Sequence, residues 1–198
     1  MNSVDFLFFD FETLSNIPVE APIISMGAIA GNWKDEHTVQ SLRDNGFYRN
    51  VEPLEQVTQY GLKPNPETIT WWANQGESAQ AVLKADKISL RDTIVQFNEW
   101  CTKVGVTHNT AVYIRAPHFD YTIYENLVRK LGMDTYRPFS HWKVRDIRTA
   151  IDIIYSVDRG YPPNYKQIEK DLNLTKHNAM DDTILDYMLM KDWFKFTD

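Results

Sequence analysis

Two acidic residues stand at the end of an apolar, aromatic-rich run near the start of the chain. The run, residues 4–12, reads Val-Asp-Phe-Leu-Phe-Phe-Asp-Phe-Glu and predicts a buried strand. On a strand, Asp10 and Glu12 leave the same face as Phe6 and Phe8, because they are two residues apart. Burying two carboxylates together is costly unless a cation offsets them, and hard oxygen ligands suit Mg²⁺ or Mn²⁺. The alternative is that the strand has already ended and that both acids are solvated.

Two more groups of titratable residues lie at expected helix starts. Asp120 is on the same helix face as the apolar Ile123, so it is either a helix cap or a site residue. His177 comes just before a closing helix, and Asp181 and Asp182 fall in the first turn of that helix. The spacing places a base beside a carboxylate, although two acids in a first turn also complement the helix dipole. The joint occurrence of Asp-x-Glu, a mid-chain Asp and a late His-x4-Asp is hard to assign to chance.

The elements that must position these residues follow from apolar periodicity and from caps. Strands are expected at 4–12, 23–30, 47–51 and 111–115, and Asp44-Asn45-Gly46 predicts a hairpin turn before the third of them. Helices are expected at 66–73, 90–104, from Pro117 to about 131, 147–154, 167–172 and 179–194. Cys101 belongs to the apolar stripe of the second of these helices, which favours packing over chemistry. The order predicts one α/β domain over residues 1–198, with three strands joined by hairpin-like links, followed by a helix, a strand and further helices.

The composition describes a globular chain with an acidic balance. Among 198 residues, 43% are hydrophobic, and the formal net charge is −6. This composition excludes a disordered or fibrous chain. No run approaches the roughly 18 apolar residues that cross a bilayer, and we expect neither a leader nor membrane association. The single cysteine fits a reducing cytoplasm and excludes a disulfide framework.

The charge is unevenly distributed along the sequence. Residues 1–100 hold 14 acids and 7 bases, whereas residues 129–176 hold 10 bases and 6 acids together with six aromatic residues. Cations bind phosphates and aromatic rings stack on bases, so this stretch has what a single-stranded polynucleotide groove needs. A solvated surface with ordinary core aromatics is the simpler interpretation.

Taken together, the motifs resemble those of the DnaQ-like, DEDDh-type 3′–5′ exonucleases, which have the ribonuclease H-like fold. The resemblance runs from Phe8-Phe9-Asp10-Phe11-Glu12-Thr13 to His177-Asn178-Ala179-Met180-Asp181-Asp182. It is nearest to the branch that contains exodeoxyribonuclease A of T-even phages and a related mycobacterial exoribonuclease. The finer match is carried by 10–13, 68–72, 115–120 and 145–149. It implies a ribonuclease H-like mixed sheet, in which three antiparallel strands are followed by parallel strands and helices flank the sheet. It also implies a chain of phage origin working in the host cytoplasm.

The resemblance also implies roles for individual residues. The implied metal ligands and the implied general base are Asp10, Glu12, Asp120, Asp182 and His177. With Asp182 at the family spacing from the histidine, Asp181 becomes a solvated or supporting neighbour.

The implied chemistry is phosphodiester hydrolysis with two Mg²⁺ or Mn²⁺ ions, the first acid bridging them. The histidine would deprotonate the attacking water and release nucleoside 5′-monophosphates from the 3′ end of single-stranded DNA or RNA. A homodimer is a further possibility, since several members of the wider family are dimers.

Contacts to the substrate are expected from a second set of residues, which is Thr13, Leu14, Trp72, Arg115 and Arg148. Because Trp71 and Trp72 point about 100° apart on a helix, one of them belongs to the core and the other is free to stack on a base. For each arginine the alternative is a structural salt bridge.

Two other functions compete with this interpretation. A phosphatase of the haloacid dehalogenase type also starts from an apolar strand ending in Asp-x-Asp-x-Thr, but here the second acid is Glu12 and the late acids open a helix. A non-catalytic nucleic-acid-binding module on the same fold is the remaining alternative, and the complete set of four acids and a histidine argues against it. The motifs of nucleotide cofactors, serine hydrolysis and structural zinc are absent from the sequence.

Overall fold

A five-stranded mixed sheet forms the centre of the computed structural model, which describes residues 3–135 and 137–194. The strands have the order β3-β2-β1-β4-β5. Their bounds are β1 Phe6–Thr13, β2 Ile23–Gly31, β3 Phe47–Asn50, β4 Ala111–Ile114 and β5 Val144–Asp146. The pairs β1–β2 and β2–β3 are antiparallel, and the pairs β1–β4 and β4–β5 are parallel. The predicted fold class is confirmed.

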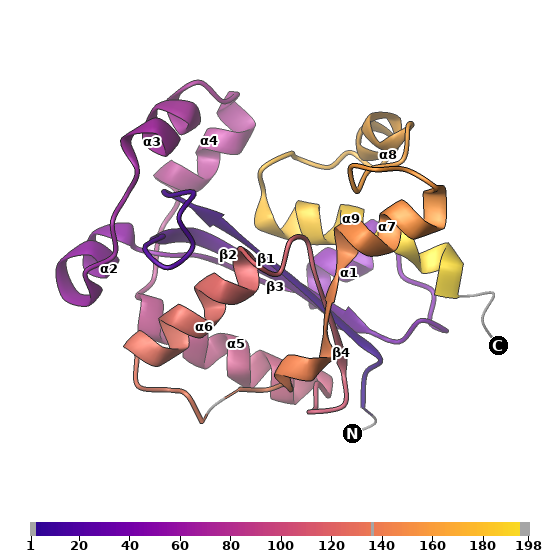
Figure 1. Ribbon diagram of the computed structural model, residues 1–198, viewed down its shortest axis with the longest axis horizontal. Helices are drawn as coiled ribbons and strands as arrows, with labels where there is room; N and C mark the ends of the chain where they lie inside the picture. Colours follow the sequence, from indigo (N-terminus) through magenta and orange to yellow (C-terminus); the bar gives the residue numbers. More distant parts are fainter. Residues whose placement is uncertain (1–2, 136, 195–198) are drawn as a thin grey trace.

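Helices cover both faces of the sheet (Figure 1). Their bounds are α1 Val39–Asn45, α2 Pro53–Tyr60, α3 Pro66–Ala73, α4 Glu77–Lys84, α5 Leu90–Val104, α6 Asp120–Lys130, α7 Ile147–Tyr155, α8 Tyr165–Asp171 and α9 Ala179–Phe194, with a 3₁₀ turn, η1, at His141–Lys143. The stripe of α5 and the apolar face of α6 pack with Leu7 and Phe9 on one face of the sheet. On the other face, α7 and α9 pack with Phe6 and Phe8. Alternation along β1 therefore divides the core into two layers.

The link from β2 to β3 is a helix, so the predicted hairpin turn at Asp44-Asn45-Gly46 is wrong. Thr38 and Ser41 form a reciprocal capping box that starts α1, and Leu42 is buried beneath it. The Asn-Gly pair thus ends a helix. Gly46 is needed there for space, because a Cβ would lie 2.6 Å from Cε of Met180 and 2.7 Å from the carbonyl oxygen of Leu42.

Several other differences concern element boundaries. The helix expected from Pro117 begins at Asp120, after a turn closed by the hydrogen bond from Phe119 N to the carbonyl oxygen of Ala116, at 2.8 Å. The caps Asn65, Ser89 and Asp146 each accept a backbone hydrogen bond at their helix starts, as expected. Helices α2 and α4 and strand β5 had no expected counterpart.

The predicted packing role of Cys101 is confirmed, since the residue is buried within the cluster that α5 forms against the sheet. Among the described helices, none combines the length and the apolar character that a membrane span needs.

Candidate active site

The acidic pair on β1 faces the layer that contains α9. Asp10 and Glu12 alternate with Phe9 and Phe11, which pack in the opposite layer, and therefore project on the side of Phe8. Asp10 is paired with Gly27 of β2. The two acids thus reach the C-terminal end of the central strand on the face that α9 covers.

Gly27 lets the start of α9 lie directly against the sheet. A Cβ at this position would be 2.3 Å from the backbone carbon of Ala179 and 2.3 Å from the nitrogen of Met180. Asn178 caps the helix, because its side-chain oxygen accepts hydrogen bonds from Met180 N at 3.1 Å and from Asp181 N at 3.2 Å. A residue without a side chain on β2 therefore fixes how close the first turn of α9 comes to Asp10.

The implied ligands converge where α9 meets β1. Ligand atoms of Glu12, His177 and Asp182 all lie within 4.8 Å of one another. Asp10 and Asp120 line the same cavity, of about 350 Å³, as these three residues. The structure therefore brings together all five residues that the family resemblance implies.

Asp120 is tied to β1. It is 4% exposed, and its Oδ1 accepts a hydrogen bond from the backbone N–H of Phe11 at 3.3 Å. The N-cap of α6 is Phe119, which makes no side-chain capping bond. This hydrogen bond holds the carboxylate of Asp120 beside the strand that carries Asp10 and Glu12.

Burial and like charge dominate the electrostatics of the cluster. Burial raises the pKa of Asp10 well above its usual range, and the carboxylates of Asp120, Glu12 and Asp182 raise it further. The pKa of Glu12 is raised well above its usual range for the same reasons. Burial also raises the pKa values of Asp120 and Asp182 to about 8. Without a cation these carboxyl groups resist ionisation, and bound divalent cations would stabilise their charged forms.

His177 lies at the edge of the cluster in a left-handed backbone conformation, with φ of 60°. Burial lowers the pKa of its imidazole below 6.5, and the neighbouring Lys176 lowers it further. The ring centroid of Trp71 lies 4.7 Å from that of His177 in an edge contact. A neutral imidazole next to carboxylates is in the protonation state of a general base at neutral pH.

Asp186 is an acid of the site that the sequence analysis did not select. It follows Asp182 by one helical turn, and its charge raises the pKa values of Asp10 and Asp182. The Nε atom of Arg115 donates to both its carboxylate oxygens, at 3.0 and 3.1 Å. Its i, i+4 spacing from Asp182 on α9 was the sequence signal that could have identified it as a residue of the site.

Arg115 is itself held from three sides. Besides Asp186, its Nη1 donates to the carbonyl oxygen of Gly160 at 2.9 Å, and its guanidinium carbon lies 4.2 Å from the ring centroid of Tyr161. The structure thus places Arg115 in the salt bridge that was the alternative to a substrate contact.

Asp181 is buried rather than solvated. Its carboxylate accepts hydrogen bonds from Nε of Arg43 at 2.9 Å and from the backbone N–H of Thr175 at 2.8 Å. Arg43 also donates to the carbonyl oxygen of Asn173 at 3.2 Å. Asp181 therefore anchors the segment that leads to His177.

A second cavity, of about 410 Å³, adjoins the cluster on the side of α3, and Glu12, Thr13, Trp71 and Trp72 are among its lining residues. Trp72 is 2% exposed, and its indole N–H donates to the carbonyl oxygen of Thr13 at 2.8 Å. Trp71 is 41% exposed. The exposed indole is thus that of Trp71, whereas Trp72, which was expected to contact the substrate, lies in the core and supports Thr13.

Of the remaining expected substrate contacts, Leu14 is half-buried and packs against the small cluster around Trp72. Arg148, at the start of α7, is exposed and lines the central cavity, which is the one of about 350 Å³ that holds the acidic cluster. Its charge opposes the raised pKa of Asp120. No salt bridge between the Arg148 guanidinium and another described residue is formed.

Comparison with known proteins supplies a family for this arrangement. The family model described as "3'-5' exoribonuclease Rv2179c-like domain" matches residues 5–193. A comparison with curated protein sequences finds no significant match.

Solved nuclease structures share the fold. The zinc-bound complex of *E. coli* exonuclease I with single-stranded DNA superposes with a TM-score of 0.62 at 15% identity, over 96% of this chain and 40% of that one. Cell-death related nuclease 4 gives a TM-score of 0.62 at 16% identity, over 97% of this chain and 64% of the other. Exonuclease I from *Methylocaldum szegediense* gives 0.60 at 11% identity, over 97% and 40%. The chain thus spans about 40% of the length of the exonuclease I structures that it matches.

Proposed function

The chain belongs to the family of Rv2179c-like 3′–5′ exoribonuclease domains, and from this membership we propose that it is a metal-dependent 3′–5′ exonuclease. The proposed reaction is hydrolysis of the last phosphodiester bond at the 3′ end of a single strand, which releases a nucleoside 5′-monophosphate. One observation carries the proposal: Glu12, His177 and Asp182 meet within 4.8 Å in the cavity that Asp10 and Asp120 also line.

The donor set fits divalent metal ions. Its buried carboxylates have pKa values raised by desolvation and by one another, and the neighbouring charges that raise the pKa of Asp10 are all carboxylates. We propose that Asp10, Glu12, Asp120 and Asp182 hold two Mg²⁺ or Mn²⁺ ions, in the DEDDh arrangement. Bound there, the ions supply Lewis-acid activation of a water and charge stabilisation at the phosphate.

The protein's own groups provide the base and the orientation. The imidazole of His177, kept neutral by burial, accepts a proton from the attacking water. Asp181 fixes the segment before His177 through Thr175. Thr13 and Trp71 line the adjoining cavity, where the terminal nucleoside is proposed to lie.

The substrate class is proposed as single-stranded RNA or DNA. The family description names an exoribonuclease, and the structural neighbours include *E. coli* exonuclease I bound to a dT13 oligonucleotide. The finer placement near the phage exodeoxyribonuclease A branch rests on the four stretches of sequence given above. A homodimer, a single nuclease domain and a cytoplasmic location stay predictions.

The proposal is tested with 3′-labelled single strands of RNA and of DNA in the presence of Mg²⁺. The parent chain should release labelled monophosphates, and EDTA should abolish the release. His177→Ala should reduce the rate at least about 100-fold, the low end of what a positioned general base contributes. Asp10→Asn removes a proposed metal ligand and should reduce the rate at least as far. Undiminished release by either variant would rule the assignment out, and binding without any cleavage by the parent would identify a non-catalytic binding module.

A further inference from the structure

Exposed cations and an exposed tryptophan lead from the cavity of the acidic cluster, which Arg148 lines, along the sheet edge formed by β5. Along the chain these are Trp142, Arg145 and Arg148, spaced three residues apart from η1 to the start of α7. We propose that the nucleic-acid strand upstream of the scissile phosphate runs along this edge, from Arg148 over Arg145 to Trp142. This inference rests on the proposed exonuclease function and extends it.

The position of His177 indicates the side on which the strand leaves. An in-line displacement puts the departing 3′ oxygen on the side of the phosphorus opposite to the attacking water, and therefore away from the base. His177 is grouped with Glu12 and Asp182, and Trp71 is in contact with its ring. Arg148 lines the central cavity from the start of α7 rather than from β1 or α9, and its charge opposes the rise in the pKa of Asp120 that burial causes.

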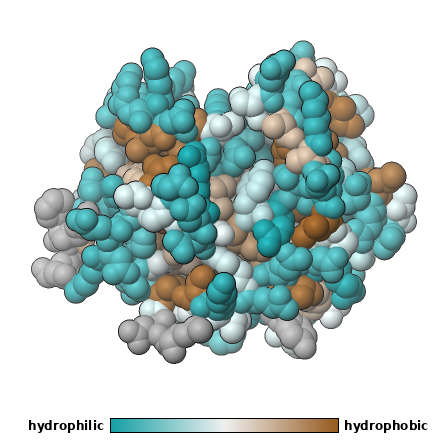
Figure 2. Space-filling model, turned by 180° about the vertical axis from the view of Figure 1, so that it is seen from behind, coloured by the Kyte–Doolittle hydropathy of each residue, from teal (hydrophilic) through white to brown (hydrophobic). Residues whose placement is uncertain are grey.

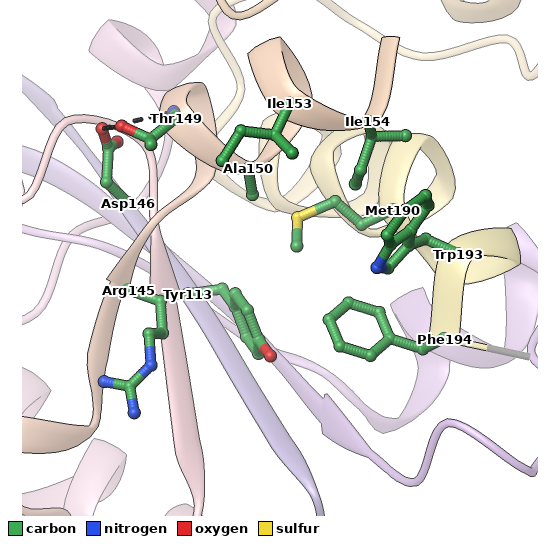
Figure 3. Close-up of a pocket in the computed structure, with 10 residues that line it drawn as sticks. All are labelled: Tyr113, Arg145, Asp146, Thr149, Ala150, Ile153, Ile154, Met190, Trp193 and Phe194. Atoms are coloured by element: carbon green, nitrogen blue, oxygen red, sulfur yellow. Dashed lines mark hydrogen bonds between the residues drawn. The ribbon is translucent and has the colours of Figure 1, made fainter. Parts of the chain in front are cut away.

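Arg148 and Arg145 are available to phosphates. Neither forms a salt bridge with another residue in the described part of the chain. Nη1 of Arg145 donates to the carbonyl oxygens of Trp142 at 2.8 Å and Val144 at 2.9 Å. These bonds orient the guanidinium without neutralising it. In Figure 3 it points away from the apolar side chains of Ile153 and Met190.

Trp142 offers a stacking surface at the far end of this edge. It is 64% exposed, and an edge contact with His141, with ring centroids 4.9 Å apart, supports it from one side. From Trp142 to Arg148 the chain spans at most about 20 Å, which accommodates a few nucleotides of an extended strand. Cations that follow the backbone and an aromatic ring that stacks on a base are the two components of a non-specific single-strand site.

A competing occupant of this edge is a second copy of the chain. An apolar pocket of about 440 Å³ lies beside Arg145, between α7 and α9, with Ile153, Trp193 and Phe194 among its walls (Figure 3). The cations favour nucleic acid over a second copy of the chain. Burying Arg145 and Arg148 in a protein interface would cost desolvation energy unless each arginine met an acidic partner. The experiment separates the two occupants.

The test measures how KM depends on substrate length. With single strands of 2, 4, 8 and 12 nucleotides and Mg²⁺, the KM of the parent should fall with length until the β5 edge is filled. Trp142→Ala should raise the KM for the 12-mer at least about five-fold, the low end of the contribution of one base–aromatic stack. Arg145→Ala should raise it too, and should make the slope of log KM against log salt concentration shallower by about 0.7, the value for one phosphate contact on a single strand.

The dinucleotide is too short to reach β5, so its rate of hydrolysis is independent of contacts to the β5 edge. Trp193→Ala and Arg159→Ala are the matched controls. Trp193 is 49% exposed, Arg159 is largely solvated, and neither belongs to η1, β5 or the start of α7. An unchanged length dependence in Trp142→Ala and Arg145→Ala, with a dinucleotide still hydrolysed by the parent, would overturn this inference and leave the exonuclease assignment in place. Light scattering completes the test, because dissociation of a dimer by Trp142→Ala without a length effect would assign the edge to a second copy of the chain.

Discussion

At the scale of single residues, the salt bridge of Arg115 with Asp186 shows how the site tolerates a fifth buried acid. Both side chains are largely buried, and the guanidinium reaches both carboxylate oxygens. Removing one partner from a buried pair leaves an uncompensated charge, whereas an exposed pair contributes little.

Arg115→Met should therefore lower the free energy of unfolding by about 3 kcal/mol. Arg115→Met combined with Asp186→Leu should recover most of that loss, because no charge is then left unpaired. The exposed pair of Lys63 and Glu20 provides the control, and Lys63→Met should cost less than about 1 kcal/mol. Urea denaturation measures all three, and equal losses in Arg115→Met and Lys63→Met would contradict the burial argument.

The raised pKa values of the carboxylates lead to a pH dependence in the absence of metal. Asp120 and Asp182, with pKa values of about 8, keep protons in the folded chain that an unfolded chain releases near pH 4. Where the folded state binds more protons, the free energy of unfolding falls as pH rises. In EDTA, the melting temperature should therefore decrease from about pH 5 to about pH 8.5 by more than about 3 °C, equivalent to roughly 1 kcal/mol for a chain of this size.

Two comparisons isolate the carboxylates from other titrating groups. Mg²⁺ should reduce the decrease, because metal binding competes with protons for the same oxygens. Asp182→Asn removes one of the titrating carboxylates and should flatten the profile. A parent profile that coincides with that of the variant in EDTA would contradict the assignment of the pH dependence to the cluster.

At this scale, spacing and family resemblance predicted which titratable residues lie together. It did not predict their partners. Asp181 and Asp182 are adjacent on one helix, yet Asp181 binds Arg43 of α1, 138 residues away in sequence. Of the Trp-Trp pair, Trp72 was expected to contact the substrate, yet it is buried and its indole N–H donates to Thr13, so the exposed tryptophan is Trp71.

At the scale of elements, the approach of α9 to β2 decides where His177 and Asp182 lie. Gly27→Ala would put a Cβ 2.3 Å from the backbone of Ala179 and Met180, so the helix would have to move away from Asp10. We expect a loss of more than about 2 kcal/mol in stability, within the range for overpacking a core contact. The metal-dependent rate should fall more than the folded fraction does, because a small displacement of the helix also separates the ligands.

Gly76→Ala is the matched control. Gly76 is the N-cap of α4, where an added Cβ would meet nothing within 4 Å. Its cost should stay below about 1 kcal/mol, the typical value for a change of N-cap residue. Thermal denaturation and nuclease rates measure both variants, and wild-type activity in Gly27→Ala would show that α9 is not held by this contact.

The elements that were predicted correctly are those whose signals are local. Caps at Asn65, Ser89 and Asp146 and the apolar stripe of α5 depend on neighbouring residues only. The helix α1 was missed because an Asn-Gly pair is also the usual signal of a hairpin turn, and only Leu42 and the capping box favour a helix there. Strand β5 has three residues, too few for any periodic pattern.

At the scale of the whole molecule, the site opens between two projecting parts of the chain. Helices α3 and α4 stand on one side and α7 and α8 on the other (Figure 1), and the opposite view shows a hollow between two raised, mostly hydrophilic masses (Figure 2). The net charge of −6 is concentrated in residues 1–100, while residues 129–176 hold an excess of bases. A polyanion can therefore approach along one side of an acidic molecule, provided that the carboxylates at its centre are neutralised.

If the proposed function holds, this charge distribution should make binding of nucleic acid depend on divalent cations even where no cleavage occurs. Asp10, Glu12, Asp120 and Asp182 would repel a phosphate in their ionised forms, and bound cations would reverse that repulsion.

Ca²⁺ also prefers oxygen ligands. At pH 8.5, a labelled single strand should bind at least about ten-fold more tightly with Ca²⁺ than in EDTA, a difference of about 1.4 kcal/mol. Asp182→Asn should narrow this difference by strengthening binding in EDTA, because a carboxylate with a pKa of about 8 is largely ionised at pH 8.5 and the substitution removes that charge. Fluorescence anisotropy measures both, with Asp158→Asn on the exposed loop as the control for a general loss of negative charge. Equal narrowing by the two variants would show that net charge, and not the carboxylate cluster, governs binding.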